Sequence, residues 1–338
     1  MLVLIFISAV FLAFSNGAND NFKGVATLFG SGTTDFKKAI NWATLTTFLG
    51  SIVSIFFASA LIKNFSGKGL VPDELLLTAE FAIAITMGAA LTVMIATKVG
   101  MPVSTTHGLV GALTGVGLLA VGSEFNFSKL GASFFLPLIV SPFLSAGLSL
   151  LFYVFFKQLK KGINISEEIN QEDGSQTYNG TVAGIPAQKA VNTAHFISAG
   201  AVSFARGFND TPKMVGLLLL IQSLDVRLGG LIIAIAIALG GILNAKKVGE
   251  TMSKKITKMN HGQGFTANLV TSLLVSTASI NGLPVSTTHV SVGSLFGIGI
   301  VTKQINLKVL SGILLSWVLT LPVAAVISSI IYLLLKTI

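Results

Sequence analysis

Long apolar runs are the feature of this sequence that most restricts its fold. Runs with little or no charge cover 1–18, 39–62, 81–97, 99–122, 131–156, 229–245, 263–302 and 309–335. A further apolar run, 187–222, is interrupted by Arg206, Asp210 and Lys213. A helix that crosses a bilayer needs about 20 predominantly apolar residues, and these runs are close to or beyond that length. The chain is therefore predicted to be an all-α, polytopic membrane protein.

The composition argues against a water-soluble body. Hydrophobic residues make up 52% of the 338 residues and charged residues 10%, whereas a soluble domain carries about 25% charged residues. The absence of cysteine excludes disulfides, thiolate metal sites and cysteine nucleophiles. The net charge of +9 is expected to come from loop lysines facing an anionic cytoplasmic leaflet. The sequence has no basic stripe with interleaved aromatic residues, the pattern that would indicate nucleic-acid binding.

Two motifs recur in the same order in the two halves of the chain. FSNGANDNFKGV at 14–25 corresponds to FARGFNDTPKMV at 204–215. GMPVSTTHGLVGALTGVG at 100–117 corresponds to GLPVSTTHVSVGSLFGIG at 282–299. Internal repeats of this kind are typical of secondary transporters.

The polar stretch in the middle of the chain divides these repeats. We expect a first membrane repeat over 1–156, a mobile cytoplasmic linker over 157–186, and a second membrane repeat over 187–338. The N-terminus is apolar from Met1 and lacks a positive flank, so it is interpreted as a first membrane helix.

Lysine positions predict the orientation of the two repeats. If the N-terminus lies outside, the lysine clusters all fall inside, as the positive-inside rule requires; they lie at 37–38, 157–161 and 246–258. In this arrangement 75–122 and 263–302 form two re-entrant helical hairpins that enter from opposite sides. The repeats are then inverted, and both termini lie outside a plasma or inner membrane. Two full crossings in place of each hairpin would preserve the sidedness of most loops, so the rule favours the orientation more than the hairpins.

The first motif places a carboxylate in the middle of an apolar span. Its two copies are Asn19–Asp20 and Asn209–Asp210. A charged side chain inside a bilayer is costly, so it indicates a functional site. Gly, Asn and Asp also favour local unwinding, and a broken helix frees carbonyl oxygens that bind small cations. One alternative is a pair of helix caps at the membrane surface. The other is a structural ion pair, because Lys23 and Lys213 follow each aspartate by three positions on the same helical face.

The second motif, PVSTTH, occupies Pro102–His107 and Pro284–His289. Pro suits the first turn of a helix and Ser or Thr suits its cap, so a helix is predicted to begin here. A helix N-terminus beside three hydroxyls is a ready anion site. The alternative is a plain turn between two helices. The closing histidines could relay protons, but hydrogen bonding to a backbone carbonyl is the favoured interpretation.

With these four motif copies, the chain resembles the inorganic phosphate transporter family, the PiT type of sodium- or proton-coupled phosphate symporters. The copies are Gly17-Ala18-Asn19-Asp20, Gly207-Phe208-Asn209-Asp210, and the two PVSTTH segments. The resemblance extends over nearly the whole chain. It implies two inverted repeats with broken transmembrane helices, two re-entrant hairpins, and phosphate as the substrate.

The second half departs from the first at two motif positions, and the chain departs from the family at a third position. Arg206 stands where the first half has Asn16, and Phe208 stands where it has Ala18. The family often carries a glutamate in the first helix of the second hairpin, where this chain has Asn268.

Charge counting on this resemblance suggests the mechanism. Two aspartates and a phosphate dianion would bring about four negative charges together, which a low dielectric does not tolerate. Two or more sodium ions are therefore expected to enter with phosphate. The expected phosphate ligands are Ser104, Thr105, Thr106, Ser286, Thr287, Thr288, Asp20 and Asp210. The expected sodium ligands are Asn19, Asp20, Asn209, Asp210, Thr105 and Thr287.

The resulting prediction is a sodium-coupled phosphate symporter that works by alternating access. It is not expected to be an enzyme or to hold a resident cofactor. Its expected partners are inorganic phosphate, sodium ions and the lipid bilayer. A homodimer is possible but is not predicted from the sequence. One rival is a proton-coupled or metal–phosphate symporter on the same fold. A channel and an intramembrane hydrolase using Ser, His and Asp are the others, and a duplicated motif without a distinct nucleophile speaks against the hydrolase.

Overall fold

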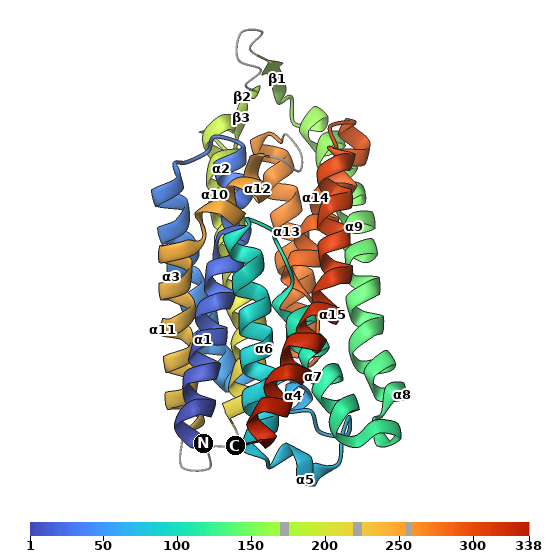
Figure 1. Cartoon of the computed structure of the whole chain (residues 1–338). Helices are drawn as coiled ribbons and strands as arrows, with labels where there is room; N and C mark the ends of the chain where they lie inside the picture. Colours follow the sequence, from blue (N-terminus) through green and yellow to red (C-terminus); the bar gives the residue numbers. More distant parts are fainter. Residues whose placement is uncertain (170–175, 219–224, 255–258, 338) are drawn as a thin grey trace.

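The protein is a bundle of long helices that run roughly along one axis, with small strands at one end (Figure 1). The computed structural model describes residues 1–169, 176–218, 225–254 and 259–337. The end of the expected span 187–222, and the expected inside lysines Lys255 and Lys258, lie outside the described residues. Both termini lie at the end of the bundle opposite the strands (Figure 1).

The first half of the chain holds nine α-helices in the described residues. They are α1 (Leu2–Asp20), α2 (Ala26–Gly30), α3 (Phe36–Phe57), α4 (Ser59–Phe65), α5 (Asp73–Leu76), α6 (Ala79–Lys98), α7 (Thr105–Val121), α8 (Phe127–Leu130) and α9 (Leu136–Gly162). Short 3₁₀ segments cover Asn21–Val25 and Gly122–Glu124, and a π-helical segment covers Gly131–Phe135. The expected span 39–62 is not one helix, because the chain breaks at Ala58 between α3 and α4.

The second half follows the same order of long elements. Its helices are α10 (Ala187–Leu218), α11 (Val226–Asn244), α12 (Lys246–Lys254), α13 (His261–Ile280), α14 (Thr287–Thr302) and α15 (Leu307–Lys336). Across the described residues of both halves, seven helical segments are long and apolar enough to cross a membrane. This result confirms the expectation of a mainly helical chain with several membrane-capable segments.

Packing partners correspond between the halves. α1 packs against α11 and α6, while α10 packs against α3 and α13. α7 packs against α15, while α14 packs against α9. Each contact thus recurs when α1, α3, α6, α7 and α9 are exchanged for α10, α11, α13, α14 and α15. α1 begins at the end that carries the termini, whereas α10 begins at the opposite end beside the strands (Figure 1).

Glycines beside the two Asn-Asp motifs allow close helix crossings. A Cβ at Gly17 would lie 1.9 Å from the carbonyl oxygen of Ile237 in α11. A Cβ at Gly207 would lie 2.1 Å from the carbonyl oxygen of Thr47 in α3. Small residues let membrane helices approach backbone to backbone. These crossings therefore hold both Asn-Asp segments firmly against partner helices.

Two helical hairpins bring the PVSTTH motifs together. α6 and α7 pack against each other, as do α13 and α14. The hydroxyl of Thr288 donates to the carbonyl oxygen of Val103 at 3.1 Å, and that of Thr106 donates to the carbonyl oxygen of Val285 at 3.4 Å. The loops that precede α7 and α14 are therefore in direct contact, although they are far apart in the sequence.

Part of the linker is folded, which corrects the expectations of an all-α chain and a mobile linker. β1 (Ser166–Ile169) pairs with β2 (Gln176–Asn179), and β3 (Thr181–Val182) pairs with β4 (Ile185–Pro186), both antiparallel. Ile165, Tyr178 and Ala187 are buried together against these strands. These three apolar residues are scattered among polar ones in the sequence, and together they form the small core on which the strands pack.

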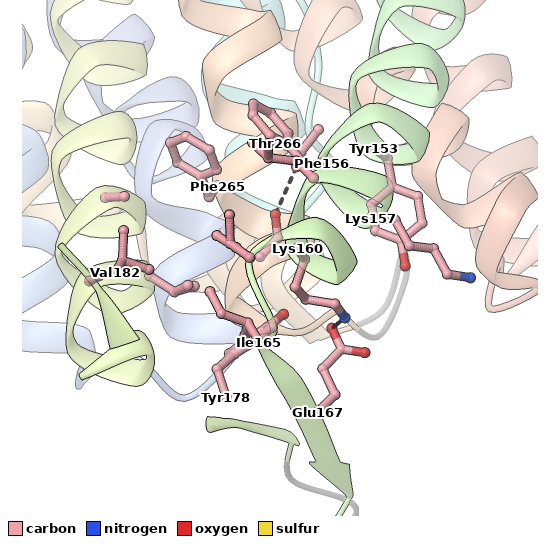
Figure 2. A pocket seen from close by; sticks show the side chains of 16 residues that line it. Tyr153, Phe156, Lys157, Lys160, Ile165, Glu167, Tyr178, Val182, Phe265 and Thr266 are labelled. Carbon is pink, nitrogen blue, oxygen red and sulfur yellow. Dashed lines mark hydrogen bonds and ion pairs between the residues drawn. The ribbon is translucent and has the colours of Figure 1, made fainter. Parts of the chain in front are cut away.

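A cavity of about 350 Å³ lies beside this cluster (Figure 2). Tyr153, Phe156 and Ile165 supply much of its apolar wall. Lys160 at its rim forms an ion pair with Glu167 at 2.5 Å. The cavity lies at the linker and contains none of the residues of the two repeated motifs.

The predicted helix break is absent from the second repeat, and in the first repeat the α-helix changes to a 3₁₀ segment within one continuous helical span, Leu2–Gly30. α1 ends at Asp20, and a 3₁₀ segment follows it. α10 instead passes through Asn209 and Asp210 without interruption, so the prediction is wrong there. The Asn209 amide donates to the carbonyl oxygen of Val285 at 3.2 Å. Because its polar group bonds to another element, it does not compete for the backbone of its own helix.

Candidate functional site

A buried ion pair stands at the end of α1. The side chains of Lys23 and Asp20 are 1% and 6% exposed, and the ammonium group bonds to Oδ1 of the carboxylate. The same Nζ lies 2.8 Å from Oδ1 of Asn19, 2.6 Å from the carbonyl oxygen of Val103 and 2.8 Å from Oγ1 of Thr288. Lys23 therefore joins α1 to the loop before α7 and to the start of α14.

The second half repeats this arrangement with the roles of the hairpins exchanged. Lys213 Nζ lies 3.0 Å from Oδ1 of Asp210 and 3.0 Å from the carbonyl oxygen of Val285. It also lies 2.8 Å from Oγ1 of Thr106, which belongs to the first half. Each lysine thus contacts a carbonyl from its own repeat and a threonine from the other.

One asparagine bridges the two carboxylates. The amide nitrogen of Asn16 lies 3.0 Å from Oδ2 of Asp20 and 3.1 Å from Oδ2 of Asp210. Its amide oxygen accepts a hydrogen bond from Arg206 at 3.1 Å, and Arg206 Nε lies 3.9 Å from Oδ2 of Asp210. Asn16 and Arg206, which occupy the same position in the two repeats, are therefore in direct contact.

Formal charges in this cluster do not match the count made from the sequence. Two carboxylates, Asp20 and Asp210, lie among three cations, Lys23, Lys213 and Arg206, all of them buried. Taken as ionised, they sum to one positive charge. The sequence count considered only the aspartates and missed the lysines as part of the site, although their three-residue spacing was the available signal.

The predicted threonines lie in this cluster. Thr105 donates to Oδ2 of Asp20 at 3.0 Å, and Thr287 accepts from the Asn209 amide at 3.3 Å. With the lysine contacts of Thr106 and Thr288 given above, all four expected threonines meet residues of the Asn-Asp-x-x-Lys segments.

The two predicted serines do not contact the charged groups. Ser104 accepts the backbone N–H of His107 at 3.2 Å, and Ser286 accepts that of His289 at 3.3 Å. They cap α7 and α14, which confirms that helices begin at the PVSTTH motifs. Because each serine meets the backbone of the histidine and not its ring, the geometry gives no support to a Ser-His nucleophile.

Two hydroxyls that sequence reasoning missed hold the motif asparagines. Asn19 donates to Oγ1 of Thr97 at 2.9 Å, and Asn209 accepts from Ser279 at 3.0 Å. Thr97 and Ser279 occupy equivalent positions near the ends of α6 and α13. Their place at the same distance before the PVSTTH proline was the signal that could have found them.

The two histidines that follow the threonines in the PVSTTH motifs pack against each other. The rings of His107 and His289 are 4.3 Å apart, and the ring of Trp317 stacks on His289 at 3.7 Å. Nδ1 of His289 lies 3.3 Å from the carbonyl oxygen of Leu138, which confirms the carbonyl interpretation for this residue. Asn268, at the position of the family glutamate, donates to Thr27 at 2.8 Å.

Comparison with known proteins identifies the family. The sequence model of the phosphate transporter family matches residues 16–328. The chain belongs to this family. A Pyrococcus abyssi protein named as a phosphate permease is 28% identical, with 98% of this chain and 97% of its own length aligned. A Rhizobium meliloti protein named as a low-affinity inorganic phosphate transporter is 27% identical, with 98% and 96% aligned.

A solved member of the phosphate transporter class has the same architecture. The structure described as "The sodium-dependent phosphate transporter" matches with a TM-score of 0.82 and 27% identity, covering 100% of this chain and 99% of that one. The family and these relatives are transporters, which fits the expectation that the chain is not an enzyme. Membership also confirms the resemblance on which the sequence-based prediction of phosphate transport was built.

Proposed function

We propose that this member of the phosphate transporter family is a secondary active symporter that takes up inorganic phosphate by alternating access. One observation carries the proposal: the N-termini of α7 and α14 converge, from different repeats, on a buried cluster whose formal charges sum to one positive charge. Helix N-termini and threonine hydroxyls suit the oxygens of a tetrahedral oxyanion. The proposed coupling ion is sodium, because the structural neighbour is described as sodium-dependent.

The arrangement of the bundle supports an inverted-repeat mechanism. We assign the repeats to 1–156 and 187–338, with 157–186 as a cytoplasmic linker and both termini outside a plasma or inner membrane. The pairs α6–α7 and α13–α14 are then re-entrant hairpins whose tips meet. Alternating access would move these hairpins, together with α9 and α15, relative to α1 and α10, which carry the Asn-Asp motifs.

Site residues are assigned on the same basis. Threonines and helix N-termini at both PVSTTH motifs bind phosphate, while Ser104 and Ser286 act by capping those helices. Asp20 and Asp210 bind both the cation and the phosphate. The cation is also bound by Asn19, Asn209, Thr105 and Thr287. Across the described residues no group of three or more His, Asp or Glu could hold a transition metal, so a metal centre is not part of the proposal.

Radiolabelled phosphate uptake into proteoliposomes tests the function. Uptake driven by an inward sodium gradient, and lost when choline replaces sodium, is the expected result. Proton coupling is the second candidate, since lysine ammonium groups already contact both carboxylates, and uptake driven by a pH gradient in choline medium would favour it. Vesicles that accumulate no phosphate under either gradient would contradict the proposed function.

Thr105→Val and Thr287→Val are expected to weaken phosphate binding by about 1–3 kcal/mol each, the cost of leaving a buried polar partner unsatisfied. The change removes a hydroxyl with little change in shape. Thr277→Val is a matched control, because its exposed hydroxyl bonds only within its own helix, to the carbonyl oxygens of Leu273 and Leu274. The measurement is the phosphate affinity of the purified variants. Unchanged affinity in both site variants would mean that the PVSTTH motifs are structural turns.

Competition by other oxyanions tests how the anion is recognised. Phosphate at neutral pH retains a proton and can donate a hydrogen bond, whereas sulfate cannot. The site offers acceptors in its two carboxylates, so rejection of an anion that lacks the donor can be large. Excess arsenate, which has the same shape and donor, is expected to block phosphate uptake, while excess sulfate has little effect. Equal inhibition by both would show that neither carboxylate contacts the anion.

A further inference from the structure

The two lysines of the site lie in oxygen shells of the kind that bind small cations. Around Lys23 Nζ stand a carboxylate, an amide, a backbone carbonyl and a hydroxyl oxygen, contributed by Asp20, Asn19, Val103 and Thr288. An ammonium group has only three N–H donors, so these four oxygens exceed its capacity. Carbonyl and carboxylate oxygens gathered at interrupted helices are the usual cation ligands of transporters.

The shell around Lys213 is built from the same classes of atom. It contains a carboxylate oxygen of Asp210, the carbonyl oxygen of Val285 and the hydroxyl of Thr106. The side chain is 1% exposed. Two independent copies of a carboxylate–carbonyl–hydroxyl shell therefore each enclose one fixed positive charge.

We propose that Lys23 and Lys213 are tethered cations that occupy the positions at which co-transported cations would otherwise neutralise Asp20 and Asp210. The inference rests on the proposed function and specifies its coupling. With the three buried cations, the two carboxylates and a phosphate dianion sum to one negative charge, which a single entering cation neutralises. The transporter therefore carries at most one sodium ion per phosphate dianion, not the two or more expected from the aspartates alone.

The location of the lysines separates this role from a purely structural ion pair. A lysine that only stabilised its own helical segment would need no contact beyond the aspartate three residues before it. Here each ammonium contacts the loop of one hairpin and, in the other hairpin, a threonine in the first turn of the helix that follows the loop. These threonines are among those proposed to bind phosphate. A charge in that place acts on the transported ions, and a buried ion pair by itself is weak evidence for a role in stability.

Lys23→Ala and Lys213→Ala test the proposal. Each removes the tethered charge and leaves its oxygen shell vacant, so each variant is expected to carry one more sodium ion per phosphate than the wild type. Paired ²²Na and ³²P fluxes in proteoliposomes measure this ratio. Lys38→Ala is the matched control: Lys38 has the same spacing from Asp35, at 3.5 Å, but both side chains are exposed. The ratio of this control should equal that of the wild type.

The outcomes separate the proposal from the function on which it rests. A wild-type ratio of two or more, or an unchanged ratio in both lysine variants, would overturn the tethered-cation proposal and leave phosphate symport intact. Wild-type vesicles that take up no phosphate in any medium would overturn the proposed function itself. If a variant does not transport, its melting temperature is measured in sodium and choline chloride. Stabilisation by sodium that the wild type lacks supports the proposal, and its absence contradicts it.

Discussion

Asp20→Asn and Asp210→Asn are each expected to lower phosphate uptake by at least about 100-fold. Removing one partner of a buried ion pair costs about 3–5 kcal/mol, because the remaining charge is left uncompensated. The loss also affects Asn16, whose amide lies between the two carboxylates. Initial uptake rates at matched amounts of reconstituted protein measure the effect, and size-exclusion profiles show whether the variants still fold.

Asp35→Asn provides the control for this prediction. Asp35 pairs with Lys38 at the same three-residue spacing, but it caps α3 at the surface. The backbone N–H of Lys38 lowers the pKa of the Asp35 carboxyl, so this control also removes a genuine charge. Its uptake should match the wild type, since exposed pairs contribute little. If both site variants kept wild-type uptake, the carboxylates would have no part in coupling or binding.

The sequence was sufficient to predict the parts of the site that depend on local geometry. Ser104 and Ser286 precede helices because their hydroxyls cap them, and that preference is visible in any PVSTTH segment. The contact between each aspartate and its lysine also follows from helical spacing alone. Repetition of the motifs then indicated that the two halves contribute in parallel.

Contacts between the halves could not be predicted in this way. Lys23 meets Thr288 across 265 residues of sequence, and Lys213 meets Thr106 across 107 residues. The residue pattern of one segment cannot predict such a contact, because the contact depends on how the hairpins pack against α1 and α10. The charge count made from the sequence failed for this reason: it had no means of placing the lysines at the proposed anion site.

The unbroken course of α10 shows tertiary contacts overriding local propensity. Asn209 and Asp210 are poor helix residues, and Pro212 follows within the same helix. Their side chains nevertheless find partners on the second hairpin and on Lys213. With those groups satisfied, the helical backbone is retained, whereas the equivalent segment after Asp20 turns into a 3₁₀ segment.

Gly17→Ala and Gly207→Ala are expected to destabilise the protein by about 3 kcal/mol or more, at the upper end of overpacking costs. Each added methyl group would lie about 2 Å from a carbonyl oxygen of the facing helix, at Ile237 and Thr47 respectively. A backbone oxygen cannot rotate away as a side chain can, so the helices must separate. Size-exclusion profiles after stepwise heating should show lower melting temperatures for both variants.

Gly147→Ala separates this clash from the general effect of replacing a helical glycine. Gly147 lies within α9, and a Cβ there would meet nothing within 4 Å. Alanine is favoured over glycine in a helix by about 1 kcal/mol, so this variant should be at least as stable as the wild type. Because Gly207 is next to the Asn209–Asp210 pair, separation of α10 from α3 would also displace Asp210 from Asn16. Gly207→Ala is therefore expected to lose phosphate uptake even at temperatures where it remains folded, and normal uptake by that variant would mean that the crossing does not position the site.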